Sequence, residues 1–222
     1  MSFLGVLMLD TRFPRPVGDI GHPQTFAALR IPVRYQAISG ASPERAVRQS
    51  DTLALQPFVE AARSLVAQGA SLLSTSCGFL ARHQRELQAA VPVPLLSSSL
   101  LWLSSPELAG QSCAVLTIDA LALDAGQLIG VGADPATPVG GVAQGCEFQR
   151  CILGDEAVMD LRQAEQDVVD AALALTLRHP AIETLVLECT NMPPYAEAVV
   201  AATGRRVEHI VSLLEKRWRL AA

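Results

Sequence analysis

The chain has 222 residues, of which 50% are hydrophobic and 18% are charged, and its formal net charge is −5. This composition excludes a disordered chain, and the length suffices to bury the core of one large α/β domain or two smaller ones. The negative charge and the absence of a basic cluster argue against a nucleic-acid-binding surface. No apolar run approaches the roughly 18 residues needed to cross a bilayer, so we expect no membrane contact. The five irregularly spaced cysteines predict no disulfide framework, and we expect a cytoplasmic protein.

Short apolar runs that predict buried strands alternate with amphipathic segments along the chain. The first run, residues 4–9, has no basic segment before it and leads into a polar Asp-Thr-Arg sequence, so it predicts a strand and not a signal peptide. The other predicted strands cover residues 33–37, 71–74, 93–96, 113–117 and 184–188. Strands that alternate with helices in this way predict parallel sheets covered by helices.

Helical patterns lie between these strands. Ser42 is expected to cap a helix whose first residue is Pro43, a position that tolerates the missing N–H. A later helix is expected to end at Gly69, and the longest one covers residues 155–179. The Gly- and Pro-rich segment 130–141 is predicted to be a surface loop, and it matches neither a dinucleotide fingerprint nor a phosphate-binding P-loop.

The chain is predicted to form two lobes. The Pro-Val-Pro sequence at 92–94 and the serines at 97–99 mark a crossing point between the two halves. The first lobe is expected to comprise residues 1–98 plus 206–222, because the tail returns to it, and the second lobe residues 99–205. The predicted fold class is therefore α/β, with two doubly wound lobes built on parallel sheets.

Two cysteines occupy matching positions about half the chain apart. Cys77 follows the predicted strand 71–74 and Cys189 follows the strand 184–188, and small polar residues and a helical pattern come after each. Ligands bind at the carboxyl ends of strands in α/β proteins, so we expect the two thiols to face one substrate. A thiol pair can remove a proton next to a carboxylate on one face and return it on the other. We expect each thiol to lie at a helix N-terminus, which lowers its pKa.

Four segments carry a family resemblance: 8–11 (Met-Leu-Asp-Thr), 74–79 (Ser-Thr-Ser-Cys-Gly-Phe), 115–117 (Val-Leu-Thr) and 188–194 (Glu-Cys-Thr-Asn-Met-Pro-Pro). They are similar to the motifs of the aspartate/glutamate racemase superfamily, which includes amino-acid and hydantoin racemases, maleate isomerases and arylmalonate decarboxylases. The resemblance implies two pseudo-symmetric lobes with the active site in an interlobe cleft, and chemistry without a cofactor or metal. Members are often dimers, and the apolar composition is compatible with a homodimer.

The resemblance also implies a function. Cys77 and Cys189 would be the catalytic acid and base of a cofactor-independent racemase or isomerase that acts on a small carboxylate-bearing substrate. The substrate-binding residues that it implies lie beside the two cysteines or after the first strand of each lobe: Asp10, Thr11, Thr75, Ser76, Gly78, Phe79, Thr117, Thr190 and Asn191.

The chain departs from the racemase motifs next to both cysteines. Gly78 and Phe79 stand where Asn-Thr is usual, and Asn191 stands where His or Glu is common. A decarboxylase or cis–trans isomerase of the same superfamily, and a catalytically silent carboxylate-binding protein, therefore stay open as alternatives. A thiol redox protein is disfavoured because the sequence has no Cys-x-x-Cys motif.

The remaining cysteines and the histidines carry weaker signals. Cys113 lies within an apolar run and is predicted to be a core residue. Cys146 and Cys151 have no further metal ligands at suitable spacing, so we expect no metal site. The four histidines are scattered, and His22, in a loop soon after the first strand, is the candidate for reaching a cleft.

Overall fold

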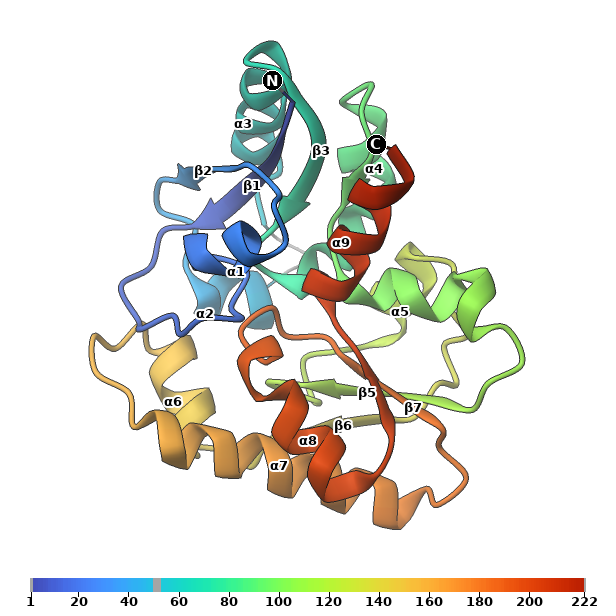
Figure 1. The fold of residues 1–222 in the computed structure, drawn as a ribbon. Helices are drawn as coiled ribbons and strands as arrows, with labels where there is room; N and C mark the ends of the chain where they lie inside the picture. Colours follow the sequence, from blue (N-terminus) through green and yellow to red (C-terminus); the bar gives the residue numbers. More distant parts are fainter. Residues whose placement is uncertain (1, 50–52, 222) are drawn as a thin grey trace.

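The computed structural model of the protein describes residues 2–49 and 53–221. These residues contain two four-stranded parallel sheets with helices packed on them (Figure 1). The first sheet has the strand order β2-β1-β3-β4 and the second has the order β6-β5-β7-β8. The second sheet thus repeats the topology of the first, and β3 and β7 occupy equivalent positions. The prediction of an α/β fold with two parallel-sheet lobes is confirmed.

The first sheet consists of β1 (Phe3–Leu9), β2 (Val33–Ile38), β3 (Ala70–Thr75) and β4 (Leu95–Leu96). The second consists of β5 (Cys113–Thr117), β6 (Val139–Gly141), β7 (Thr184–Leu187) and β8 (Arg206–Glu208). The α-helices are α1 (Pro23–Ala28), α2 (Pro43–Arg48), α3 (Gln56–Ala67), α4 (Gln84–Ala89), α5 (Ala125–Gly130), α6 (Glu147–Leu153), α7 (Leu161–Arg178), α8 (Ala196–Thr203) and α9 (Ile210–Ala221). None of the helices in the described ranges is both long enough and apolar enough to cross a membrane.

Local chemistry explains several of these boundaries. The hydroxyl of Ser42 accepts a hydrogen bond from the N–H of Arg45 at 3.4 Å and caps α2, with Pro43 in the first turn as predicted. Helix α3 ends just before Gly69, whose φ of +102° is readily adopted by glycine and rarely by other residues. The strand expected at 93–96 shortens to two residues, because prolines on either side of Val93 have no N–H to donate to a ladder.

The helix predicted over residues 155–179 begins later than expected. Its N-cap is Asp160, whose carboxylate accepts hydrogen bonds from N–H groups of the first turn, and α7 starts at Leu161. Asp155 lies six residues earlier with a φ of +51°, a left-handed conformation that no residue keeps inside a right-handed helix. The apolar stripe correctly identified the helix, but the cap and the backbone turn set its start.

Two short strands escaped prediction. The segment 130–141, expected to be a surface loop, contains β6, which pairs with β5. Two glycines remove the alternating pattern that marks a strand, and a side chain at Gly140 would press against Leu175 of α7. Strand β8 pairs with β7, so the lobe boundary placed at residue 206 wrongly assigned the three residues of β8 to the first lobe.

Helix α9 packs against the first sheet after the chain leaves β8. Ile210 and Leu214 share an apolar cluster with Leu4, Val6 and Leu72 of β1 and β3. In Figure 1 this helix, at the red end of the colour scale, lies at the side of the first lobe. The tail therefore ties the end of the chain to its beginning and buries a face of the first sheet.

We predict that the buried face of α9 is an anchor. Leu214 is fully buried, whereas Leu220 on the same helix is 70% exposed. The substitution L214A should lower the free energy of unfolding by about 2–5 kcal/mol, because it leaves a cavity in a packed cluster. The matched substitution L220A should change it by less than about 0.5 kcal/mol. Urea denaturation followed by circular dichroism measures both, and equal losses would contradict this account of α9.

Candidate active site

A small cavity of about 20 Å³ lies between the two lobes, where the ends of β1, β3, β5 and β7 come together. Its wall residues come from both lobes and are mostly apolar. They are Leu9, Phe13, Pro43, Val47, Ser76, Cys77, Gly78, Phe79, Ile118, Ile152, Glu188, Cys189, Thr190 and Asn191. Among these described wall residues none is Lys, Arg or His, so Glu188 and the two thiols are the groups that can carry charge there.

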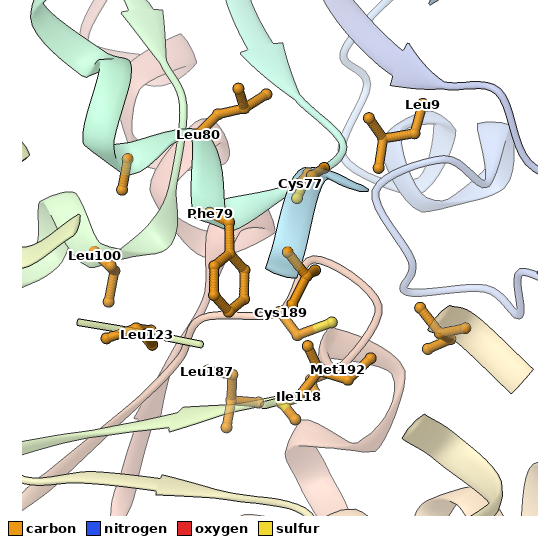
Figure 2. Close-up of a cluster of buried hydrophobic side chains, with 14 of the residues drawn as sticks. Leu9, Cys77, Phe79, Leu80, Leu100, Ile118, Leu123, Leu187, Cys189 and Met192 are labelled. Atoms are coloured by element: carbon orange, nitrogen blue, oxygen red, sulfur yellow. The ribbon is translucent and has the colours of Figure 1, made fainter. Parts of the chain in front are cut away.

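The two predicted cysteines both line this cavity. Cys77 follows β3 and Cys189 follows β7, the equivalent strands of the two sheets, and each residue is 6% exposed. Figure 2 shows them in one cluster of buried side chains that also contains Phe79, Leu9 and Ile118. The repeated topology explains this meeting, because the same strand end in each lobe delivers one thiol.

The loop after β3 holds Cys77 in an extended conformation, with φ −145° and ψ 115°, as the N-cap of a 3-10 turn (Gly78–His83). The Thr75 hydroxyl donates a hydrogen bond to the carbonyl oxygen of Cys77 at 2.9 Å and fixes the loop. The N–H groups of Phe79 and Leu80 face the sulfur and lower the pKa of the thiol, but burial and the nearby Glu188 raise it to about 12. The expected low pKa at a helix N-terminus is therefore wrong for this cysteine, because desolvation outweighs the N–H groups.

A chain of polar contacts from the first lobe orients Cys189. Its Sγ donates to Oδ1 of Asn191 at 3.5 Å, and Nδ2 of Asn191 donates to Asp19 at 2.6 Å. The fully buried Asp19 also accepts from Arg15 at 2.8 Å, and Arg15 donates to Thr11 at 2.9 Å. Because a carboxylate can only accept, Asp19 turns the amide oxygen of Asn191 towards the thiol.

The electrostatics of Cys189 resemble those of Cys77. Burial and the neighbouring Glu188 raise the pKa of the Cys189 thiol well above its ordinary value, although the N–H of Asn191 lowers it. Both cysteines are therefore protonated at neutral pH in this structure, and the expectation of a lowered pKa is wrong here too. Ionising either thiol requires a positive charge that the wall residues do not supply.

Glu188 is a buried carboxylate between the two cysteine loops that sequence reasoning missed. It is fully buried, and its Oε2 accepts a hydrogen bond from the hydroxyl of Thr117 at 2.6 Å. Its Oε1 has no hydrogen-bond partner among the described residues and lies against Gly78, where a Cβ would overlap it. Burial raises the pKa of Glu188 to about 7, partly opposed by the Thr117 hydroxyl. The available signal was an acidic residue ending an apolar strand.

The hydroxyl groups expected at the substrate are largely engaged within the protein. Thr190 donates to the carbonyl oxygen of Ser76 at 2.7 Å, and the Ser76 hydroxyl accepts from the N–H of Leu9 at 2.8 Å. Thr75 and Thr117 are fully buried and donate to the partners described above. These hydroxyls hold the two cysteine loops in place, and the lobes are joined through the Thr190 bond.

The nine residues implied at the substrate therefore separate into two groups. Five of them line the cavity: Ser76, Gly78, Phe79, Thr190 and Asn191. The other four, Asp10, Thr11, Thr75 and Thr117, are not among its wall residues. Asp10 is exposed, and Thr11 is half-buried. Besides Glu188, the structure places Asp19 near the second thiol, and Asp19 lies in a Gly- and Pro-rich loop without a sequence signal.

The other cysteines and His22 lie outside the cavity. Cys113 is half-buried, so its assignment to the core is correct only in part. Cys151 donates to the carboxylate of Glu147 at 3.2 Å. No group of three potential metal ligands occurs among the residues that the structure describes. The imidazole of His22 accepts from an N–H in the first turn of α1 and caps that helix.

The proteins similar to this chain in sequence are lyases, whereas the solved structures with a similar fold include a decarboxylase and racemases. No family model matches the chain. The chain is 30% identical over 213 residues to dimethylsulfoniopropionate lyase from Durusdinium sp. clade D, and the aligned region covers 90% of this chain and 69% of that protein. It is 32% identical over 219 residues to dimethylsulfoniopropionate lyase 6 of Emiliania huxleyi, and the aligned region covers 90% of this chain. The chain spans just over half, 55%, of the length of that second relative.

The structural neighbours share the fold at low sequence identity. A double mutant of arylmalonate decarboxylase in the liganded form has a TM-score of 0.61 at 16% identity, over all of this chain and 92% of that one. Glutamate racemase from Bacillus anthracis has a TM-score of 0.59 at 17% identity, over 99% of this chain and 81% of that one. The fold is therefore that of the aspartate/glutamate racemase superfamily, as the sequence motifs indicated.

We predict that Glu188 links stability to pH. Its pKa is about 7 in the folded protein against 4.5 when exposed, so the unfolded carboxyl ionises first as the pH rises. Wild type is therefore destabilised by about 3 kcal/mol above pH 7 relative to acid conditions, and E188Q escapes this cost. The unfolding free energy of E188Q minus that of wild type should grow by about 3 kcal/mol from about pH 4 to about pH 8.

Denaturant titrations across that pH range measure the difference. The matched control is E60Q, which removes an exposed carboxylate on α3 and should show no such trend. A difference between E188Q and wild type that stays constant across the range would contradict the burial argument.

Proposed function

Because the chain belongs to the family of the dimethylsulfoniopropionate lyases, we propose that it is a cofactor-independent lyase acting on a small carboxylate with a positively charged leaving group. Dimethylsulfoniopropionate is the substrate named for its relatives. In the proposed reaction a thiolate removes a proton from the carbon next to the carboxylate. The C–H electron pair forms the new C=C bond, and the C–S pair leaves on sulfur. The products are acrylate, dimethyl sulfide and one proton, which passes from the cysteine to solvent.

The observation that carries this proposal is the placement of two buried thiols in one small, mostly apolar cavity whose described wall residues include no Lys, Arg or His. Both thiols have raised pKa values, so a thiolate formed there is a strong base. The positive charge that favours its formation would come from the substrate itself. A sulfonium group supplies such a charge, and its methyl groups suit the apolar wall.

Cys77 is the better candidate for the base. Two N–H groups, of Phe79 and Leu80, face its sulfur, whereas the N–H of Asn191 alone opposes the raised pKa of Cys189. Burial leaves the pKa of Cys77 at about 12. The N–H groups that stabilise a thiolate can also stabilise the negative charge that develops on the substrate carboxylate as the proton is removed. Elimination requires one base, so Cys189 would serve as a proton donor or position the substrate.

Racemisation is the second candidate function. It is favoured by the equivalent placement of Cys189, since a second thiol on the opposite wall could return the proton to the other face. Decarboxylation by the same thiols belongs to this group of alternatives. Elimination differs from both in needing a leaving group on the neighbouring carbon, and the sequence relatives are lyases.

We predict different outcomes for the two cysteines. With dimethylsulfoniopropionate, C77S should lose activity by a factor of about 10³ or more, because the base is gone. C189S should retain activity within about tenfold of wild type, since one thiolate suffices for elimination. Headspace chromatography of dimethyl sulfide and proton spectra of acrylate measure the rates.

The matched control is C113S, which changes a half-buried cysteine outside the cavity and should leave the rate unchanged. Racemisation makes a contrasting demand, because both C77S and C189S should then abolish inversion of a chiral acid. Wild-type enzyme that releases no dimethyl sulfide, while exchanging the α-hydrogen of a chiral acid in heavy water, would replace the lyase proposal with the racemase one.

A further inference from the structure

Glu188 is a fully buried acid in the cavity wall that the proposed elimination leaves without a task. Its Oε2 is held by the Thr117 hydroxyl, whereas Oε1 has no partner in the part of the chain that the structure describes. Burying a carboxyl group without satisfying it is costly, so natural proteins rarely retain one in an apolar wall. Oε1 of Glu188, which lies next to both cysteine loops, is therefore a candidate group for binding a ligand.

We propose that Glu188 is the anionic partner of a positively charged group on the substrate, so that the site selects onium carboxylates over neutral ones of the same shape. This inference rests on the function proposed above and specifies how its substrate is recognised. The expected class is a short carboxylate whose far end is a sulfonium or a quaternary ammonium.

The chemistry of the surrounding wall favours an onium group over an ordinary ammonium. An ammonium ion needs several hydrogen-bond acceptors, but Phe79, Ile118 and Ile152 near the site offer apolar surface. A sulfonium or quaternary ammonium donates no such hydrogen bond and is weakly hydrated. It therefore needs negative charge and apolar contact together, and this combination is what Glu188 and its neighbours provide.

The geometry around Gly78 lets the carboxylate act there. A side chain at this position would overlap both Oε1 and the carbonyl oxygen of Glu188. With glycine present, Oε1 lies directly against the loop that carries Cys77. A cation beside Oε1 would thus also lie close to the thiol, and its charge would favour the thiolate that removes the proton.

The number of protons exchanged on binding distinguishes an ionised Glu188 that binds a cation from a neutral Glu188 that donates a hydrogen bond to the substrate carboxylate. A carboxyl group with a pKa of about 7 is half protonated at neutral pH. A cation bound beside it lowers its pKa and releases a proton. If Glu188 instead stayed neutral and donated a hydrogen bond to the substrate carboxylate, binding would raise its pKa and take up a proton. The titratable groups nearest to it, Cys77 and Cys189, are both neutral at this pH and would add no signal of their own unless they ionise.

The test uses two unreactive ligands of matched shape, 3-(trimethylammonio)propionate and its neutral isostere 4,4-dimethylpentanoate. Calorimetric titration at pH 7 in two buffers of different ionisation enthalpy gives the dissociation constants and the number of protons exchanged. Wild type should bind the cationic ligand at least about tenfold more tightly than the neutral one and should release a fraction of a proton.

The substitution E188Q should reduce this preference to within about threefold and abolish the proton release, because the charge is gone while the side-chain shape is kept. The matched control is E44Q, which changes an exposed carboxylate on α2 beside the wall residue Pro43 and should keep the wild-type preference. Thermal unfolding of each variant checks its fold. If E188Q does not fold, the wild-type protein alone still tests the proposal, because proton release on binding the cationic ligand supports it and proton uptake contradicts it.

Three results would overturn the proposal: an unchanged preference in E188Q, proton uptake by wild type on binding the cationic ligand, or no binding of that ligand at all. None of these measurements depends on turnover. Protein that keeps the Glu188-dependent preference but releases no dimethyl sulfide would refute the lyase function and leave this inference standing. Protein that releases dimethyl sulfide without such a preference would support the lyase function and refute the role of Glu188.

Discussion

The hydrogen bond from the Thr190 hydroxyl to the carbonyl oxygen of Ser76 holds together the two loops on which the site depends. Each loop follows the same strand of a repeated sheet, and each carries one cysteine. The bond spans the two lobes and, together with the bond from Asn191 to Asp19, holds the loop of Cys189 against the first lobe. The hydroxyls of Thr75 and Ser76 fix the first loop from behind. The hydroxyl residues beside the cysteines thus mainly hold the two cysteine loops in position around the cavity.

Burial governs the chemistry of this gap. The two thiols and Glu188 are removed from water, and this raises the pKa of all three. The site at rest is consequently close to neutral and holds no strong base. A substrate that brings its own positive charge changes this balance, because it stabilises both a thiolate and the Glu188 carboxylate. On the function proposed above, a cysteine of this site becomes a strong base only when a cationic substrate is bound.

The racemase fold and the lyase relatives are consistent with each other at the level of proton chemistry. Racemisation, decarboxylation and elimination all pass through negative charge on the carbon next to a carboxylate. A leaving group on the neighbouring carbon diverts that charge into a new double bond. The fold supplies two strand ends facing each other, and the wall of the cavity selects the substrate. In this chain the wall includes Glu188, whose Oε1 has no hydrogen-bond partner among the residues that the structure describes.

The sequence alone determined the features that depend on local chemistry. Apolar runs marked most strands of both sheets, Ser42 and Pro43 marked a helix start, and matching strand ends marked Cys77 and Cys189. Strand β6 was hidden because two glycines leave no pattern. Asp19 and Glu188 were hidden because their importance comes from neighbours far along the chain, Asn191 in one case and Thr117 in the other.

The ionisation state of the two thiols was decided by tertiary structure. A helix N-terminus can be read from a sequence, and it indicated a low pKa. The depth of burial and the position of Glu188 cannot be read in this way, and together they raise that pKa instead. Desolvation acts over the whole surroundings of a group, which the chain creates only when its two lobes come together.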